Sequence, residues 1–317
     1  MSVAADAFRP IEACWICGGR RLSPYHTLRF DLDVFRNGDQ DHELASYTGA
    51  TLRLMRCGAC GFGQPEALPS LPRYFDRMYD QRPDEGWIAG EFQAEYKDLI
   101  FRTILDELER RLGRDRRRLL DVGAHAGRFL SLAAARGWQA EGIELNPQTA
   151  AYAAAHAGVP VHQMNAAALA AGGRRYDAIV LTDVLEHIPS PADILKTLVT
   201  LLEPGGVLGI KVPCGSAQAL KERTLAAITS HRATLADNLV HVNHFSPASL
   251  ALALDRAGLA STVIAAAPEL NAMRAFNPRV ALSNALRLGI YRLARLPGAI
   301  HSPLALHLQA YGVRRAA

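Results

Sequence analysis

The chain has 317 residues, which is enough to bury the core of one large domain together with a smaller module. With 49% hydrophobic and 21% charged residues it has the composition of an ordinary globular protein, and a formal net charge of +4 does not by itself indicate a nucleic acid partner. No stretch approaches the roughly 18 uninterrupted apolar residues of a membrane span, and residues 1–10 lack the apolar core of a secretory signal.

Four of the five cysteines form two Cys-x-x-Cys pairs near the N-terminus, Cys14 with Cys17 and Cys57 with Cys60. A glycine follows each pair, which lets backbone N–H groups turn toward sulfur. In a chain with no visible export signal, this pattern favours a metal in a reducing cytoplasm over disulfides. We expect a cytoplasmic protein with a structural Zn²⁺ on four thiolates; rubredoxin-like iron and incidental cysteines are the alternatives.

The chain divides near residue 85. Residues 1–85 are expected to form the zinc-binding module and a linker, and residues 86–317 the main domain. This domain opens with a helical stretch at Trp87–Leu112, where apolar side chains recur at helical spacing: Phe92, Tyr96, Leu99, Ile100, Ile104 and Leu108.

From Arg118 onward, strand and helix patterns alternate. Strands are predicted at Leu119–Val122, Ala140–Ile143, Val159–Gln163, Ala178–Leu181 and Val207–Val212, with Leu259–Ala266 and Leu304–Tyr311 closing the sheet. Helices are predicted between them at Gly127–Arg136, Pro147–Ala157 and Pro191–Leu202. This alternation predicts an α/β fold with a Rossmann-like, doubly wound parallel sheet that binds its ligand at the carboxyl ends of the strands.

The turn after the first of these strands, Asp121–Gly127, is the most informative segment. A strand that ends in an acid, followed by a glycine-containing turn into a helix, brings backbone N–H groups against a bound cofactor. The next strand ends at Glu144, where a carboxylate can accept hydrogen bonds from a ribose diol. The turn has neither the Gly-Lys-Ser/Thr of a phosphate loop nor the usual dinucleotide spacing, and another Rossmann-like nucleotide binder is the alternative.

Four features over Leu119–Val212 resemble the class I S-adenosylmethionine (SAM)-dependent methyltransferases. They are the Asp121-x-Gly123 loop, Glu144, the segment Tyr176–His187 and the turn Leu202–Gly206. The resemblance implies SAM as cofactor, with Asp121 and the loop glycines around the methionine moiety and Glu144 on the ribose. Asn165 stands about where many relatives have an acid that bonds the adenine amino group. The implied cofactor-binding set is Asp121, Gly123, Ala124, His125, Gly127, Glu144, Leu145, Asn165, Asp183 and Val184.

The segment Leu185-Glu186-His187 resembles the subgroup that methylates small molecules, quinones and sugars. Together with the cysteine module, it resembles the sugar C- and O-methyltransferases of polysaccharide and natural-product clusters. The C-methylating enzymes usually carry a further Rossmann-like domain, for which the roughly fifty residues after the sixth strand are too few. O-methylation is therefore expected at least as strongly as C-methylation of a keto-sugar.

Methyl transfer to oxygen requires a base for the acceptor proton, and histidine is the natural base near neutral pH. The candidates are His187, His241 and His244. His187 alternatively buttresses its loop, and the other two lie beside a predicted helix start at Ser246-Pro247. An additional divalent metal held by Asp183, Glu186 and His187 is a further possibility.

Within a helical insertion at about residues 270–300, the stretch Pro278–Leu296 places leucines on one face and arginines elsewhere. Such a helix either packs on its own protein or lies peripherally on an anionic membrane.

The sequence therefore predicts a SAM-dependent methyltransferase acting on a small-molecule acceptor, most simply a hydroxyl of a sugar, a nucleotide-sugar or a related metabolite. The alternatives are a zinc-containing RNA methyltransferase and a non-catalytic scaffold. No nucleic acid partner is expected, because the module shows no dense Lys/Arg interleaved with aromatics.

Overall fold

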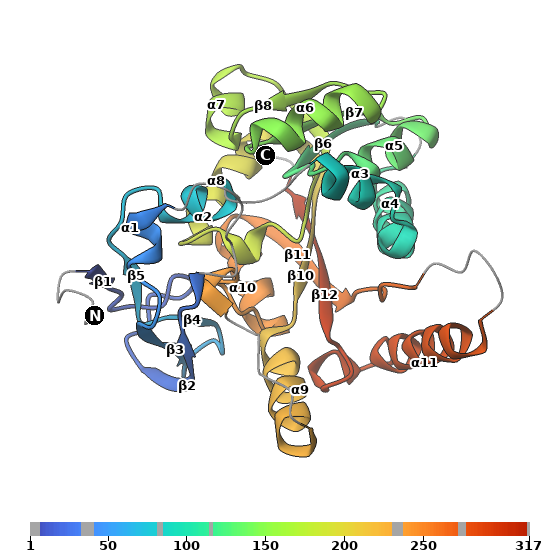
Figure 1. Ribbon diagram of the computed structural model, residues 1–317. Coiled ribbons are helices and arrows are strands. Elements are labelled where there is room, and N and C mark those ends of the chain that lie inside the picture. The colour runs from blue at the N-terminus through green and yellow to red at the C-terminus, as the bar shows by residue number, and fades with distance from the viewer. Residues whose placement is uncertain are drawn as a thin grey trace.

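A seven-stranded mixed sheet forms the centre of the protein, as a computed structural model shows (Figure 1). The structure describes residues 7–32, 41–80, 85–113, 117–229, 237–271 and 277–315. The strand order is β11-β12-β10-β9-β6-β7-β8. The strands are β6 (Arg118–Val122), β7 (Gln139–Glu144), β8 (Val161–Gln163), β9 (Tyr176–Thr182), β10 (Leu202–Pro213), β11 (Leu259–Ala265) and β12 (His307–Arg314).

The doubly wound α/β prediction is confirmed, but β12 departs from a purely parallel sheet. It pairs antiparallel with both β10 and β11. The first residue of β12, His307, pairs with Pro213 at the carboxyl end of β10, and Leu308 pairs with Ala265 at the carboxyl end of β11. The connection from β11 thus begins and ends at the same edge of the sheet, so β12 must enter between its neighbours in the opposite direction.

Helices cover both faces of the sheet, whereas α9 (Gly215–Ile228) and α11 (Pro278–Ala294) extend away from it (Figure 1). The other helices of the main domain are α3 (Glu85–Gln93), α4 (Asp98–Leu112), α5 (Arg128–Ala135), α6 (Pro147–His156), α7 (Ala166–Ala171), α8 (Pro191–Leu201) and α10 (Pro247–Arg256). Successive residues of β9 point to opposite faces. Ala178 and Val180 share one core cluster with α4 and α5, whereas Ile179 and Leu181 share another with α8 and α10.

The helical lead-in predicted at Trp87–Leu112 is not continuous. α3 ends at Gln93, Ala94 adopts an extended conformation, and a 3₁₀ turn over Glu95–Lys97 precedes α4. The predicted start of α10 is confirmed: the Ser246 hydroxyl accepts from the backbone N–H of Ser249, and Pro247 takes the first helical position.

The N-terminal region is a small module of short strands and turns. Its elements are β1 (Phe8–Pro10), β2 (Leu22–Arg29), α1 (His42–Ala45), β3 (Thr51–Cys57), β4 (Gly63–Pro65), β5 (Ala67–Pro69) and α2 (Tyr74–Asp80). Strands β2, β3 and β4 form an antiparallel sheet, and β1 pairs with β5.

The module and the main domain pack against each other. Gly63 and His244 exchange two backbone hydrogen bonds of 2.9 Å each, and the rings of Phe62 and Phe245 lie 5.1 Å apart. Each pair joins a residue of the module to a residue of the segment that carries two predicted catalytic histidines, His241 and His244. The module therefore helps to support that segment.

Candidate cofactor and acceptor site

The turn between β6 and α5 is held by its neighbours. The backbone N–H groups of Gly123 and Ala124 donate to the carbonyl of Ile143 at 2.9 and 3.0 Å. Both predicted loop glycines have positive φ, and an added Cβ would lie 2.5 Å from Val184 Cγ2 at Gly123 and 2.8 Å from Ala157 Cβ at Gly127. Close packing against the residues that follow β9 and α6 therefore accounts for both glycines.

Two carboxyl groups lie at the ends of adjacent parallel strands, Asp121 on β6 and Glu144 on β7. The Asp121 side chain is buried, and this burial, together with the charge of Glu144, raises its pKa to about 8. Two neighbouring carboxyl groups of this kind disfavour a bound anion and favour a bound cation. A sulfonium cofactor with an ammonium group fits this chemistry, whereas a phosphate group does not.

The Glu144 carboxylate is fixed by three backbone donors. Its Oε1 atom accepts from the N–H groups of Leu145 and Asn146, and its Oε2 atom accepts from the N–H of His125. A carboxylate oxygen has two lone pairs, so Oε2 is the oxygen with a position left for a ribose hydroxyl. The side chain of the next residue, Leu145, is 61% exposed.

Asn165 has a structural task in addition to its predicted role. It is the N-cap of α7, where its Oδ1 atom accepts from the N–H of Ala168 at 2.8 Å. The oxygen expected to contact adenine thus already accepts one hydrogen bond. His125 is part of the loop itself, and its ring lies edge-on to that of Trp87, with the ring centroids 5.2 Å apart.

Asp183, at the end of β9, is paired with two lysines that the sequence analysis did not identify. The Lys97 Nζ atom lies 3.1 Å from its Oδ2, and the Lys211 ammonium donates to its Oδ1. Although burial opposes ionisation, these two cations hold the pKa of Asp183 well below its usual range. The sequence signal for Lys211 was a lysine within the apolar run of β10, where it is only 1% exposed.

Glu186, His187 and His241 bring their ligand atoms within 4.8 Å of one another. Glu186 is 1% exposed, and neither of its carboxyl oxygens has a hydrogen-bond partner among the described residues. Burial and the nearby Asp183 charge raise its pKa to about 8. Burial, with His187 and His244 nearby, lowers the pKa of His241 to about 3, which keeps its imidazole neutral.

His244 is not a member of this cluster. Its buried ring lies against Tyr25 of the module, and its Nε2 atom is 3.1 Å from the backbone carbonyl of His241. Burial lowers the pKa of His244 to about 4. Among the three predicted histidines, the structure therefore brings His187 and His241 together, and gives His244 a position in the interface between module and main domain.

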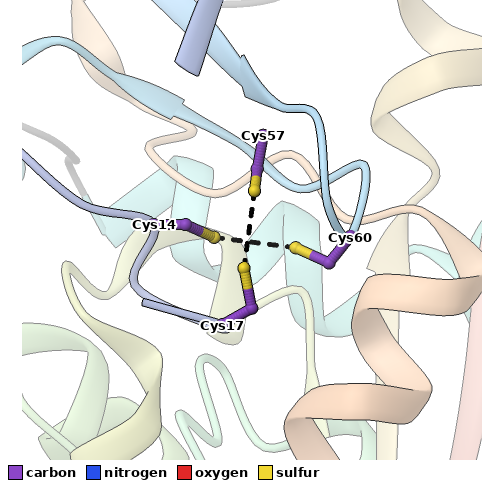
Figure 2. Close-up of side chains that lie close together, drawn as sticks. All are labelled: Cys14, Cys17, Cys57 and Cys60. Atoms are coloured by element: carbon purple, nitrogen blue, oxygen red, sulfur yellow. Dashed lines mark hydrogen bonds between the residues drawn. The ribbon is translucent and has the colours of Figure 1, made fainter. Parts of the chain in front are cut away.

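The four N-terminal cysteines point toward a common centre (Figure 2). The Sγ atoms of Cys14 and Cys60 are 3.6 Å apart, and those of Cys17 and Cys57 are 3.4 Å apart. Four Zn–S bonds of about 2.3 Å in a tetrahedron would put the sulfurs about 3.8 Å apart, close to these distances. The backbone N–H of Gly19 donates to Cys17 Sγ and that of Ala59 to Cys57 Sγ, as the glycine pattern predicted for the first pair.

The described residues contain no helix that combines the length and the apolarity needed to cross a bilayer.

Comparison with solved structures supports the fold. The plantazolicin methyltransferase BpumL, in complex with SAH, aligns over 76% of this chain and 94% of that chain, with 12% identity and a TM-score of 0.50. A chain from the complex between the Haloferax volcanii Trm112 methyltransferase activator and a methyltransferase aligns over 74% of this chain and 99% of that chain, with 17% identity and a TM-score of 0.50. At these identities the likeness concerns the fold.

Sequence comparison gives closer relatives over a shorter region. Ubiquinone biosynthesis O-methyltransferases of Burkholderia multivorans and Burkholderia orbicola are 38% and 35% identical over 96 residues, which are 28% of this chain and 41% of each relative. The chain thus spans about two fifths of the length of these relatives. A family model described as a methyltransferase domain matches residues 92–263, more than half of the chain. The chain therefore belongs to the methyltransferase-domain family.

Proposed function

We propose that the protein transfers a methyl group from SAM to a hydroxyl oxygen of a small-molecule acceptor. The observation that carries this proposal is the pair of carboxyl groups, Asp121 and Glu144, at the carboxyl ends of β6 and β7. Family membership supports the same cofactor. When bound, SAM would supply an electrophilic methyl carbon, at which an acceptor oxygen displaces the sulfur.

In this proposal the chain binds the cofactor through separate groups. Asp121, ionised by the approach of a cation, faces the methionine part, and the Oε2 atom of Glu144 accepts from the ribose. Leu145 and Asn165 flank the adenine. Asp183 and Val184, which directly follow β9, border the cofactor site on the side of that strand. The two ion pairs with Lys97 and Lys211 hold the Asp183 carboxylate in place.

The acceptor proton goes to a histidine of the cluster. His187 donates through Nδ1 to the carbonyl of Val240, so its Nε2 atom is the proton acceptor. The acceptor O–H bond would break toward this nitrogen as the new C–O bond forms and the methyl–sulfur bond breaks, with S-adenosylhomocysteine as the leaving group. His241 lies beside it, with ring centroids 4.8 Å apart, and contributes an imidazole that burial keeps neutral.

The same cluster supports a second role, the binding of a divalent cation that orients the acceptor hydroxyl. The two unpartnered oxygens of buried Glu186 favour it, because a metal would satisfy them. His241 replaces Asp183 in the ligand set that the sequence suggested, since the Asp183 carboxylate is bound by two lysines. We further propose that Zn²⁺ binds the four-cysteine cluster and has a structural role.

For the acceptor, we propose a hydroxyl of a sugar or a related metabolite. The relatives that act in ubiquinone biosynthesis are O-methyltransferases, which supports oxygen as the methylated atom. The test is a panel of nucleotide-sugars, free sugars and phenols with methyl-labelled SAM, followed by identification of the labelled atom. Transfer to a hydroxyl that is lost in Glu144→Ala supports the proposal; label found only in RNA, or no SAM binding, contradicts it.

A further inference from the structure

Helix α11 presents an exposed row of leucines to solvent. Leu282, Leu286 and Leu293 are 72%, 63% and 52% exposed, and Leu296, just beyond the helix, is 56% exposed. At about 100° per residue, the three helical leucines fall within about 40° of one another around the axis. In Figure 1 the helix extends away from the central sheet.

The opposite side of α11 is attached to the protein. Asn284, which the same spacing puts about 180° from the leucines, donates through Nδ2 to the carbonyl of Asn271 and accepts from its N–H at Oδ1. Ala294 is buried, and Tyr291 packs at the margin of the core. The leucine row therefore faces outward because the helix is fastened by its other face.

The charge of this region has one sign. After Glu269, the sequence contains seven arginines, no lysine and no aspartate or glutamate. Arg279 and Arg292 are exposed on the two flanks of the leucine row, and Arg287 and Arg295 are exposed nearby. An apolar row flanked by guanidinium groups is the arrangement of a helix that lies in the headgroup region of an anionic bilayer.

We propose that α11 docks the protein peripherally on an anionic phospholipid surface. The leucine row enters the interface and the arginines bind lipid phosphates. This surface lies in the connection between β11 and β12, which begins and ends at the carboxyl edge of the sheet, the edge that also carries Asp121 and Asp183.

Charge argues against a second copy of the chain as the occupant. A face-to-face pair of α11 helices would bring arginines of one copy against arginines of the other, with no acidic side chain in residues 277–315 to neutralise them. An anionic bilayer supplies the complementary charge together with an apolar layer for the leucines.

The experiment is flotation of the full-length protein with vesicles of phosphatidylcholine containing phosphatidylglycerol, and with vesicles of phosphatidylcholine alone. We expect binding to the anionic vesicles that weakens at high salt, because screening shortens the range of the arginine–lipid attraction. Replacing Leu282, Leu286 and Leu293 with serine should abolish binding. Arg279→Gln with Arg292→Gln should weaken partitioning about 30-fold.

A matched double variant, Arg73→Gln with Arg110→Gln, removes the same charge from exposed positions in the module and in α4 and should bind vesicles like the parent protein. Calorimetry with SAM on every variant reports that the fold is retained. Three outcomes overturn the proposal: no flotation of the parent protein, equal losses in the two arginine pairs, or a leucine-dependent dimer in solution that does not bind lipid.

Discussion

The Nδ1 atom of His187 lies 2.6 Å from the backbone carbonyl oxygen of Val240. Because a carbonyl oxygen only accepts, Nδ1 carries the proton of the neutral ring and Nε2 carries its lone pair. Val240 directly precedes His241, whose ring centroid is 4.8 Å from that of His187. One hydrogen bond thus sets the tautomer of the first histidine and links it to the segment that carries the second.

This contact gives the first prediction. His187→Ala should lower kcat by about 10²–10⁴, the range for loss of a positioned general base, and leave SAM affinity unchanged. Single-turnover transfer of labelled methyl and calorimetry measure the two quantities separately. His301→Ala, at an exposed position, is the matched control and should retain activity. A His187→Ala enzyme with parental kcat would exclude His187 as the base.

SAM binding should release a proton near neutral pH. The Asp121 pKa of about 8, raised by burial and by Glu144, means that this carboxyl is mostly protonated in the unliganded protein at pH 7. A cationic ligand favours the carboxylate and lowers that pKa. Calorimetry in two buffers with different ionisation enthalpies measures the proton release, and it should vanish in Asp121→Asn. Affinity should increase as pH rises toward 8; a flat profile would contradict the assignment.

The raised pKa of Asp121 also makes the stability of the protein depend on pH. This pKa is higher in the folded protein than the ordinary value of 3.8, so the folded state binds more protons between about pH 4 and pH 8. Its contribution to the free energy of unfolding therefore falls as pH rises through this window. Below about pH 6.5 the buried, neutral His241 and His244 contribute the opposite slope, because their pKa values are lowered from 6.5 to about 3 and 4, so the net fall is expected between about pH 6.5 and pH 8. Glu186, also raised to about 8, adds to the slope, and Asp121→Asn should remove part of it. Saturating SAM should counter the fall at the upper end.

The elements that carry local signals were predictable from the sequence. Short apolar runs that alternate with helical patterns predicted the seven strands. The Ser246-Pro247 pair predicted the start of α10. The paired cysteines predicted a four-thiolate cluster because each pair is local and the two are chemically alike. In each case the determining information lies within a few neighbouring residues.

Contacts between distant residues were not predictable in the same way. Lys97 and Lys211 reach Asp183 from positions 86 and 28 residues away, and the Lys97 contact depends on the extended Ala94 that interrupts the expected helix. His244 looked equivalent to His241 in sequence, three residues apart. Only the pairing of its backbone with Gly63, from the module, turns its ring into the interface.

Loss of the four-cysteine cluster should reduce turnover without removing the cofactor site. Cys57→Ser with Cys60→Ser should lose the metal, expected at about one zinc per chain. Phe62 follows this pair and packs on Phe245, so the segment that carries His241 would lose support. We expect a lower kcat with unchanged SAM affinity. Cys214→Ser, outside the cluster, should keep its zinc and its kcat. A variant that retains stoichiometric zinc would contradict the ligand assignment.

A single methyl group should test the contact between module and main domain. An added Cβ at Gly63 would lie 2.7 Å from the Tyr25 hydroxyl and 2.8 Å from His244 Cβ, so Gly63→Ala must separate β4 from the His244 segment. Overpacking of this kind costs about 1–3 kcal/mol, and urea unfolding should show a lower midpoint. Gly90→Ala in α3 is the matched control, because its Cβ meets nothing within 4 Å. There alanine should stabilise the helix by about 0.5–1 kcal/mol. Equal midpoints for the two variants would mean that Gly63 does not hold the module against the main domain.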